Sequence, residues 1–108
     1  MTSITNERLS QSLQYLADTD EHAAELKADV ERQEYMFKRS KALAFKLAEG
    51  TVADRNATAE TSADAGTAAE KWFAAIKDSE TVRAKRQTAA LIVEVWRSMN
   101  ANRRTGNI

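Results

Sequence analysis

Arginines in the last part of the sequence are the residues whose type and spacing could do chemistry, because clustered guanidinium groups bind phosphates. One pair is separated by three positions, and a second group follows near the end of the chain. Binding of a nucleic-acid backbone by such residues weakens steeply as salt is added. The candidate nucleic-acid-binding residues are therefore Arg83, Arg86, Arg97, Arg103 and Arg104.

Each of these features also has a purely structural explanation. Arg83 and Arg86 could pair with acidic side chains on a neighbouring helix. Basic residues at 97–104 suit the negative end of a helix dipole. Trp72 and Trp96 could stack on bases, but both belong to apolar repeats, and packing against another helix explains them better.

Other chemistry-bearing residue types are scarce. The chain has one histidine, His22, and no cysteine, so disulfides, thiolate chemistry and cysteine-based zinc sites are excluded. It contains no glycine-rich phosphate loop, and a lone histidine does not supply the converging ligands of a metal site. We expect a protein with no catalytic residues, metal, cofactor or small-molecule substrate, and therefore not an enzyme.

Sparse turn residues predict an all-helical fold. The 108 residues contain no proline and three glycines, whereas a sheet protein needs a turn every ~8–12 residues. This length suits a single helical domain, residues 1–108, with 103–108 as a frayed tail. No apolar run approaches the ~18 residues of a membrane span, and the first residues lack a signal-peptide pattern. We therefore expect a cytoplasmic protein that does not bind a membrane.

Apolar spacing and capping residues predict two helices in the first half of the chain. From Leu9 onward every seventh residue is apolar as far as position 44, as in a helix that faces a partner helix along its length. Asp18 is a good N-cap residue, which predicts a short helix at about 5–17 and then a long helix at about 20–49. Gly50 is a natural stop for the long helix.

The second half repeats this pattern. Thr51 and Thr61–Ser62 are cap residues that predict a short helix at about 52–60 and a long helix at about 62–102. Because the apolar surface of these helices exceeds what one pair of helices covers, we expect a helical-bundle homo-oligomer. The residues expected in core or oligomer packing are Leu9, Leu13, Leu16, Trp72, Phe73, Leu91, Ile92, Val95, Trp96 and Met99.

Charge is strongly blocked, although the net charge is zero. Residues 1–36 carry three basic and eight acidic side chains, and residues 37–46 carry four basic ones. Residues 47–80 carry three basic and seven acidic side chains, and residues 81–108 carry six basic and one acidic. An antiparallel hairpin of the two long helices sets opposite blocks side by side, whereas a parallel pair sets like against like. The charges therefore predict the hairpin.

The end of the chain, AALIVEVWRSMNANRRTGNI, and the helical stretch at 13–45 resemble a group of short, largely uncharacterised helical proteins of tailed phages and prophages. The shared pattern is Glu-Val-Trp-Arg at 94–97, followed by asparagine, alanine and arginine at 100–104. Genes of this group often lie near recombination and replication genes. By association, the resemblance implies an accessory role in DNA metabolism in a bacterial host cell, and it supplies no catalytic residues.

Two kinds of function stay open at this point. In the first, the protein is a non-catalytic accessory of DNA recombination or replication that binds single-stranded DNA, or a DNA-bound recombination or replication protein, through its basic end. In the second, it is a protein–protein interaction module, such as an inhibitor or adaptor of a host or phage factor, or a structural assembly protein. Neutral net charge argues against avid non-specific DNA binding, whereas the basic end favours the first function.

Overall fold

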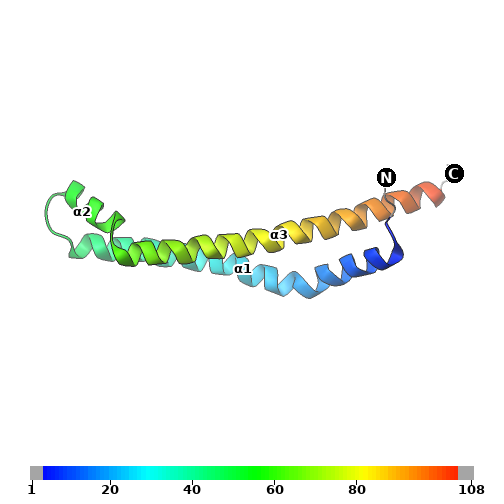
Figure 1. Ribbon diagram of the computed structural model, residues 1–108, viewed down its shortest axis with the longest axis horizontal. Helices are drawn as coiled ribbons and strands as arrows, with labels where there is room; N and C mark the ends of the chain where they lie inside the picture. The colour runs from blue at the N-terminus through cyan, green and yellow to red at the C-terminus, as the bar shows by residue number, and fades with distance from the viewer. Residues whose placement is uncertain (1–3, 105–108) are drawn as a thin grey trace. The chain divides into compact units, whose positions relative to one another are not determined.

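The computed structural model describes residues 4–104, with the side chain of Arg104 outside the described part. This part of the chain forms three helices and no strand (Figure 1). They are α1 (Asn6–Leu47), α2 (Val52–Glu60) and α3 (Ala63–Arg104). The all-helical prediction, with two long helices, is confirmed. No helix in the described range is both long enough and apolar enough to cross a membrane.

A residue with a hydroxyl side chain caps the N-terminus of each helix. The sequence pattern predicted two of these three caps, those of α2 and α3. The side-chain oxygens of Thr5, Thr51 and Ser62 accept hydrogen bonds from the backbone N–H three residues on, at 3.1, 3.1 and 3.2 Å. At α2 the Asp54 carboxylate also accepts from the Thr51 N–H at 3.2 Å, which completes a capping box. These bonds satisfy amides that a first helical turn leaves without partners.

The predicted break near Asp18 is wrong, because α1 continues through this segment. The polar side chains there bond within the helix instead of capping a new one. Asp18 Oδ1 accepts a hydrogen bond from Gln14 Nε2 at 2.7 Å, and Thr19 Oγ1 donates to the Tyr15 carbonyl at 2.7 Å. An N-cap needs extended backbone at Asp18, and contacts from α3 to residues 16–20 hold this segment helical. Local capping preference is therefore overridden by tertiary contacts.

The chain divides into two compact units, and each contains a segment of both long helices. Unit 1 consists of Met1–Ala23 with Thr81–Ile108, and unit 2 is Ala24–Glu80. Within each unit the segments of α1 and α3 run antiparallel, in the direction that the charge blocks predicted (Figure 1). That the whole chain is one domain stays a prediction, and most of the predicted frayed tail lies outside the described residues.

Small side chains make up the core of both units. Among the described residues, those buried in unit 2 are Ala59, Ala65 and Ala75, and those buried in unit 1 are Ser12 and Ala89. No large side chain of the described chain is fully buried. Alanine lets helices approach closely but removes little apolar area from water, so most larger side chains keep part of their surface exposed.

The residues predicted to pack divide into two sets. Leu13, Phe73 and Leu91 are 48%, 55% and 63% exposed, so they do not belong to the core of this chain, and their burial in an oligomer stays a prediction. The others are half-buried between the helices: Leu9, Leu16, Trp72, Ile92, Val95, Trp96 and Met99.

In unit 2 the short α2 secures the end of α1. Arg55 Nε donates a hydrogen bond to the Phe45 carbonyl at 3.2 Å, and its guanidinium carbon lies 4.5 Å from the centre of the Phe45 ring. Its second nitrogen, Nη2, reaches the Lys46 carbonyl at 3.5 Å. Carbonyls in the last turn of a helix have no partner within it, so Arg55 acts as their cap.

Between α1 and α2 the chain turns at Gly50, which has a φ of 105°. A Cβ at this position would lie 2.9 Å from Asp54 Oδ2, the oxygen that closes the α2 capping box. Both the positive φ and the closeness of the carboxylate require glycine here.

Candidate nucleic-acid interface

Arg86 holds α1 and α3 together in unit 1. Its Nη1 donates to the Leu16 carbonyl at 2.9 Å and to Thr19 Oγ1 at 2.6 Å. Nη2 donates to Asp20 Oδ1 at 2.6 Å in a charge-assisted bond. The Arg86 side chain is only 24% exposed. Because its guanidinium is engaged with α1, Arg86 is not part of the candidate interface.

Arg97 and Arg83 are exposed on α3 but already interact within the chain. Arg97 Nη1 lies 3.0 Å from Glu94 Oε1, and both side chains are well exposed. A pair of this kind adds little stability, and it partly neutralises the Arg97 charge. The predicted role of Arg104 concerns a side chain outside the described residues.

Arg103 lies in unit 1 where the first described residues meet the last turns of α3. A groove of about 290 Å³ there, the Arg103 groove, is lined by Ile4, Thr5, Asn6, Trp96, Met99, Asn100 and Arg103. It combines one guanidinium with the amides of Asn6 and Asn100 and the apolar surface of Trp96. Guanidinium and amide groups are hydrogen-bond donors that bind phosphate and base edges.

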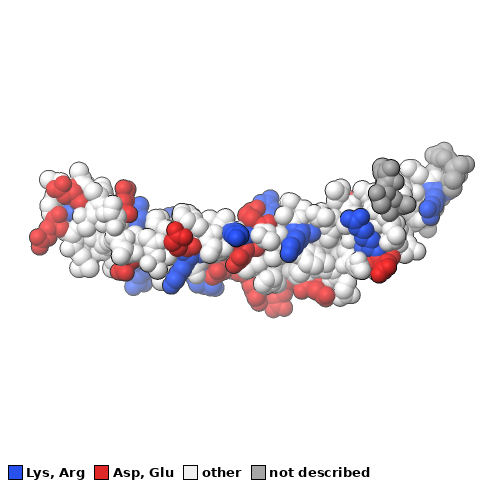
Figure 2. All heavy atoms as spheres, viewed as in Figure 1, with Lys and Arg blue, Asp and Glu red and all other residues white. Residues whose placement is uncertain are grey.

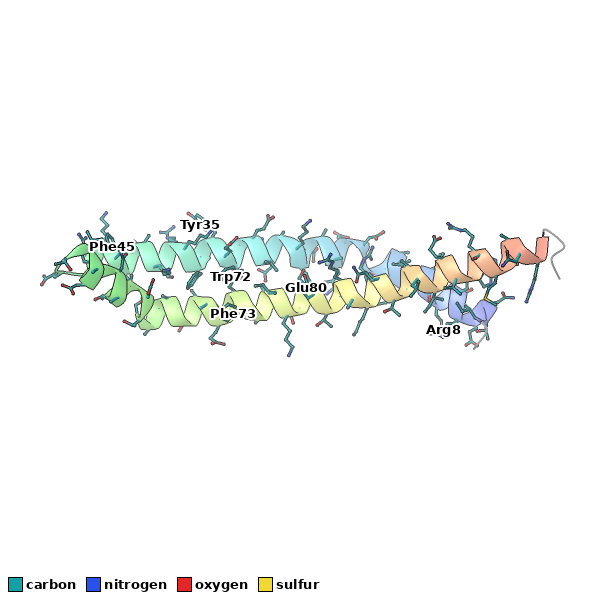
Figure 3. All side chains as sticks on the ribbon, turned by 90° about the horizontal axis from the view of Figure 1, so that it is seen from above. Arg8, Tyr35, Phe45, Trp72, Phe73 and Glu80 are labelled. Carbon is teal, nitrogen blue, oxygen red and sulfur yellow. The ribbon has the colours of Figure 1, made fainter. Side chains whose placement is uncertain are left out.

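A second groove of unit 1 brings together residues that the arginine pattern did not indicate. This Arg8–Lys85 groove has a volume of about 360 Å³ and is lined by Arg8, Gln11, Ser12, Tyr15, Lys85, Thr88, Ala89 and Ile92. Ser12 and Ala89 are buried, so these two small residues form its floor. Arg8 and Lys85 are exposed, and the half-buried Tyr15 adds an aromatic ring. Figure 3 labels Arg8 on the N-terminal part of α1.

The grooves of unit 2 have a different electrostatic character. One of about 280 Å³ has Glu31 and Glu80 in its lining beside Lys27. Another of about 330 Å³ has Glu60 beside Lys41. The linings of the Arg8–Lys85 groove and the Arg103 groove contain no acidic residue among those described. Figure 2 shows basic and acidic side chains interspersed on the visible face. The grooves therefore differ in the charged residues that line each one, and not in the net charge of a whole face.

Sequence reasoning missed Arg8, which lies in an acidic block, and it missed the pairing of Arg8 with Lys85, which belongs to the basic run at 83–86 and lies 77 positions further along the chain. A usable signal was the seven-residue spacing from Arg8 to Tyr15 and from Lys85 to Ile92. Such spacing places both members of a pair on the same side of a helix. Which sides of α1 and α3 face each other depends on the register of the two helices, which the spacing alone does not determine.

In the range 4–104, no three histidine, aspartate or glutamate side chains are grouped so that they could hold a metal ion. Comparisons with protein families, with curated proteins and with solved structures found no match to this chain.

Proposed function

We propose that this protein is a non-catalytic accessory of DNA recombination or replication, acts in the cytoplasm of a bacterial host, and binds single-stranded DNA through unit 1. The observation that carries the proposal is the Arg8–Lys85 groove, in which every charged lining residue is basic. Proteins that bind single strands combine cationic groups for the phosphates with flat apolar surfaces for the bases. Tyr15 and Ile92 supply the second component.

Binding in this groove favours single strands over duplexes. The Tyr15 ring can stack only on a base whose face is free, and a duplex keeps its bases stacked on one another. Arg8 and Lys85 contact the phosphates, while Gln11 and Thr88 offer hydrogen bonds to base edges or sugars. Because these polar groups fit no particular base pattern, the binding is largely independent of sequence.

The Arg103 groove extends this surface along α3. Ile92 lines the Arg8–Lys85 groove and Met99 lines the Arg103 groove. These residues are seven positions apart, so the grooves follow one another on the same side of α3. From Lys85 to Arg103 the helix rises about 27 Å. A strand following this side meets three basic residues, Arg8, Lys85 and Arg103.

An affinity measurement tests the proposal. Anisotropy of a fluorescent single-stranded oligonucleotide, titrated with protein at low salt, should show saturable binding that an equal concentration of unlabelled duplex displaces poorly. Replacing Arg8 and Lys85 together by alanine should weaken binding at least about tenfold. The matched control, Lys27→Ala with Lys38→Ala, removes the same charge from unit 2 and should leave the affinity unchanged. Equal losses in both variants would contradict a site in unit 1.

A second variant tests the role of the aromatic ring. Tyr15→Leu should lower the affinity about fivefold or more, because stacking of one base on an aromatic side chain contributes about 1–3 kcal/mol. Tyr15→Phe keeps the ring and should bind like the wild type. If Tyr15→Leu binds as well as Tyr15→Phe, the bases do not lie against this residue.

A protein–protein interaction module is the second candidate function, and a different observation favours it. Unit 2 exposes several large apolar side chains on α1, with Tyr35 62%, Met36 45%, Leu43 48% and Leu47 83% exposed. Exposed apolar residues that gather on one side of a helix are typical of surfaces that bind another protein. An adaptor, an inhibitor or an assembly protein would use this surface and not the grooves. Absence of oligonucleotide binding even at low salt would favour this candidate.

A further inference from the structure

The Arg103 groove of unit 1 is lined by polar side chains from both ends of the described chain. The amides of Asn6 and Asn100 and the guanidinium of Arg103 line it together with the indole of Trp96. In the described range 4–104, no hydrogen bond or ion pair joins the side chains of Asn6, Asn100 and Arg103 to another residue. The donors and acceptors of this groove are therefore available to a ligand.

Two different helices supply the two amides. Asn6 is the first residue of α1, and the half-buried Asn100 lies near the end of α3. An amide side chain carries an N–H donor and an acceptor oxygen next to each other. A base edge with a neighbouring donor and acceptor can therefore pair with one amide through two hydrogen bonds. Amides from two helices can contact two edges of the same base.

Trp96 supplies the flat surface on which a base can stack. It is half-buried, so part of the indole stays accessible in the lining of the groove. Bases stack on aromatic side chains in sites for single strands. The fused double ring of a purine covers more of an indole than the single ring of a pyrimidine, and more apolar area is then removed from water. The indole therefore favours a purine.

We propose that the Arg103 groove binds one unpaired purine base of the single strand, an inference that rests on the proposed function. The purine stacks on Trp96, one amide pairs with its Watson–Crick edge, the other donates to N7, and Arg103 contacts the phosphate of that nucleotide. N7 is an acceptor in both adenine and guanine and has no counterpart in thymine or cytosine. The Arg8–Lys85 groove then holds the strand whatever its sequence is, and the Arg103 groove adds a preference at one nucleotide.

Fluorescence anisotropy of the full-length protein with oligonucleotides of equal length tests the preference. The reference is oligo-dT, and the others carry adenine, guanine or 7-deazaadenine at every third position. At low salt the adenine and guanine oligonucleotides should bind about threefold to tenfold more tightly than oligo-dT. 7-Deazaadenine keeps the double ring and the Watson–Crick edge but has carbon in place of N7. Its oligonucleotide should therefore bind about threefold less tightly than the adenine one.

Replacing both amides tests the residues of the groove. Asn6→Ala combined with Asn100→Ala should lower the affinity for the adenine oligonucleotide at least about threefold and change that for oligo-dT by less than about twofold. Asn56→Ala is the control at an exposed asparagine of unit 2 and should keep the full preference. Circular dichroism verifies that both variants retain their helices.

The outcomes separate this inference from the proposed function. If the protein binds none of the oligonucleotides, both are wrong. Saturable binding with equal affinity for oligo-dT and for the purine oligonucleotides would leave the proposed function standing and overturn the purine site. A preference that survives the loss of both amides, or that is the same for adenine and 7-deazaadenine, would also overturn it.

Discussion

Unit 1 and unit 2 join segments of the same two helices by different means. In unit 1 the guanidinium of Arg86 reaches from α3 to three oxygens of α1. In unit 2 the aromatic rings of Phe37 and Trp72 stack with centroids 5.4 Å apart. Where a guanidinium joins α1 and α3 and the buried residues are small, a groove lined by basic residues remains beside the contact. Where stacked aromatic rings join α1 and α3, the rings fill the space between the helices. Other apolar residues then remain exposed on the surface.

The ring contact of unit 2 extends beyond one pair. Trp72 also stacks on its neighbour Phe73 with centroids 5.9 Å apart, and Lys41 Nζ lies 5.4 Å from the centre of the Phe37 ring. The buried Trp72 Nε1 has no hydrogen-bond partner, which costs part of the stability that the ring contributes. Unit 2 therefore depends on the shape of the indole rather than on its N–H group.

The largest expected effect comes from removing this ring. Trp72→Ala should lower the free energy of unfolding by about 3 kcal/mol, because a large aromatic contact is lost. Trp72→Phe should cost less than half as much, since it keeps a ring and removes the unpartnered donor. Urea denaturation followed by circular dichroism, at one fixed protein concentration, measures both. Equal losses in the two variants would mean that the indole N–H matters and that the comparison of the units is wrong.

A smaller effect is expected from the polar link of unit 1. Arg86→Met keeps the aliphatic stem but removes the guanidinium, and it should cost about 2 kcal/mol because three hydrogen bonds are lost, one to an exposed carboxylate. Arg97→Met removes an exposed pair on the same helix and should change the stability by less than about 0.5 kcal/mol. The same denaturation series compares them. An unchanged stability of Arg86→Met would show that side-chain packing without this polar link holds unit 1 together.

Two glycines of unit 2 give the smallest effects, and these have opposite signs. Gly50→Ala forces a side chain into a backbone with positive φ and against Asp54 Oδ2, so it should destabilise by about 1–2 kcal/mol. Gly66 is helical and a Cβ there meets nothing within 4 Å. Gly66→Ala should therefore stabilise by up to about 1 kcal/mol. Thermal melts of both variants test this, and shifts of the same sign would contradict the account of the turn.

Local signals in the sequence predicted the fold well. Thr51 and Ser62 begin helices because a hydroxyl reaches the third amide along the chain, whatever the surroundings are. Asp18 failed as a cap because the contacts of Arg86 come from a segment far along the sequence. Propensity arguments cannot include such contacts until the pairing of the helices is known.

The candidate site was less predictable for a related reason. Arg103 was identified from its place in a basic cluster, whereas Arg8 and Lys85 became partners only through the register of α1 on α3. Arg86 was identified in the same way from the basic run at 83–86, but its side chain faces α1 and bonds there. Counting arginines locates a basic segment, and only the direction of each side chain shows which of them can meet a ligand.

The most direct test of the central claim is the salt dependence of single-strand binding to the wild type and to the Arg8→Ala, Lys85→Ala variant. Each neutralised phosphate contributes about 0.7 to the slope of log affinity against log salt for single strands. Three basic residues in the two grooves predict a wild-type slope of about −2, and the variant should fall to about −0.7. The same slope in both proteins would show that phosphates bind elsewhere and would contradict the proposed interface.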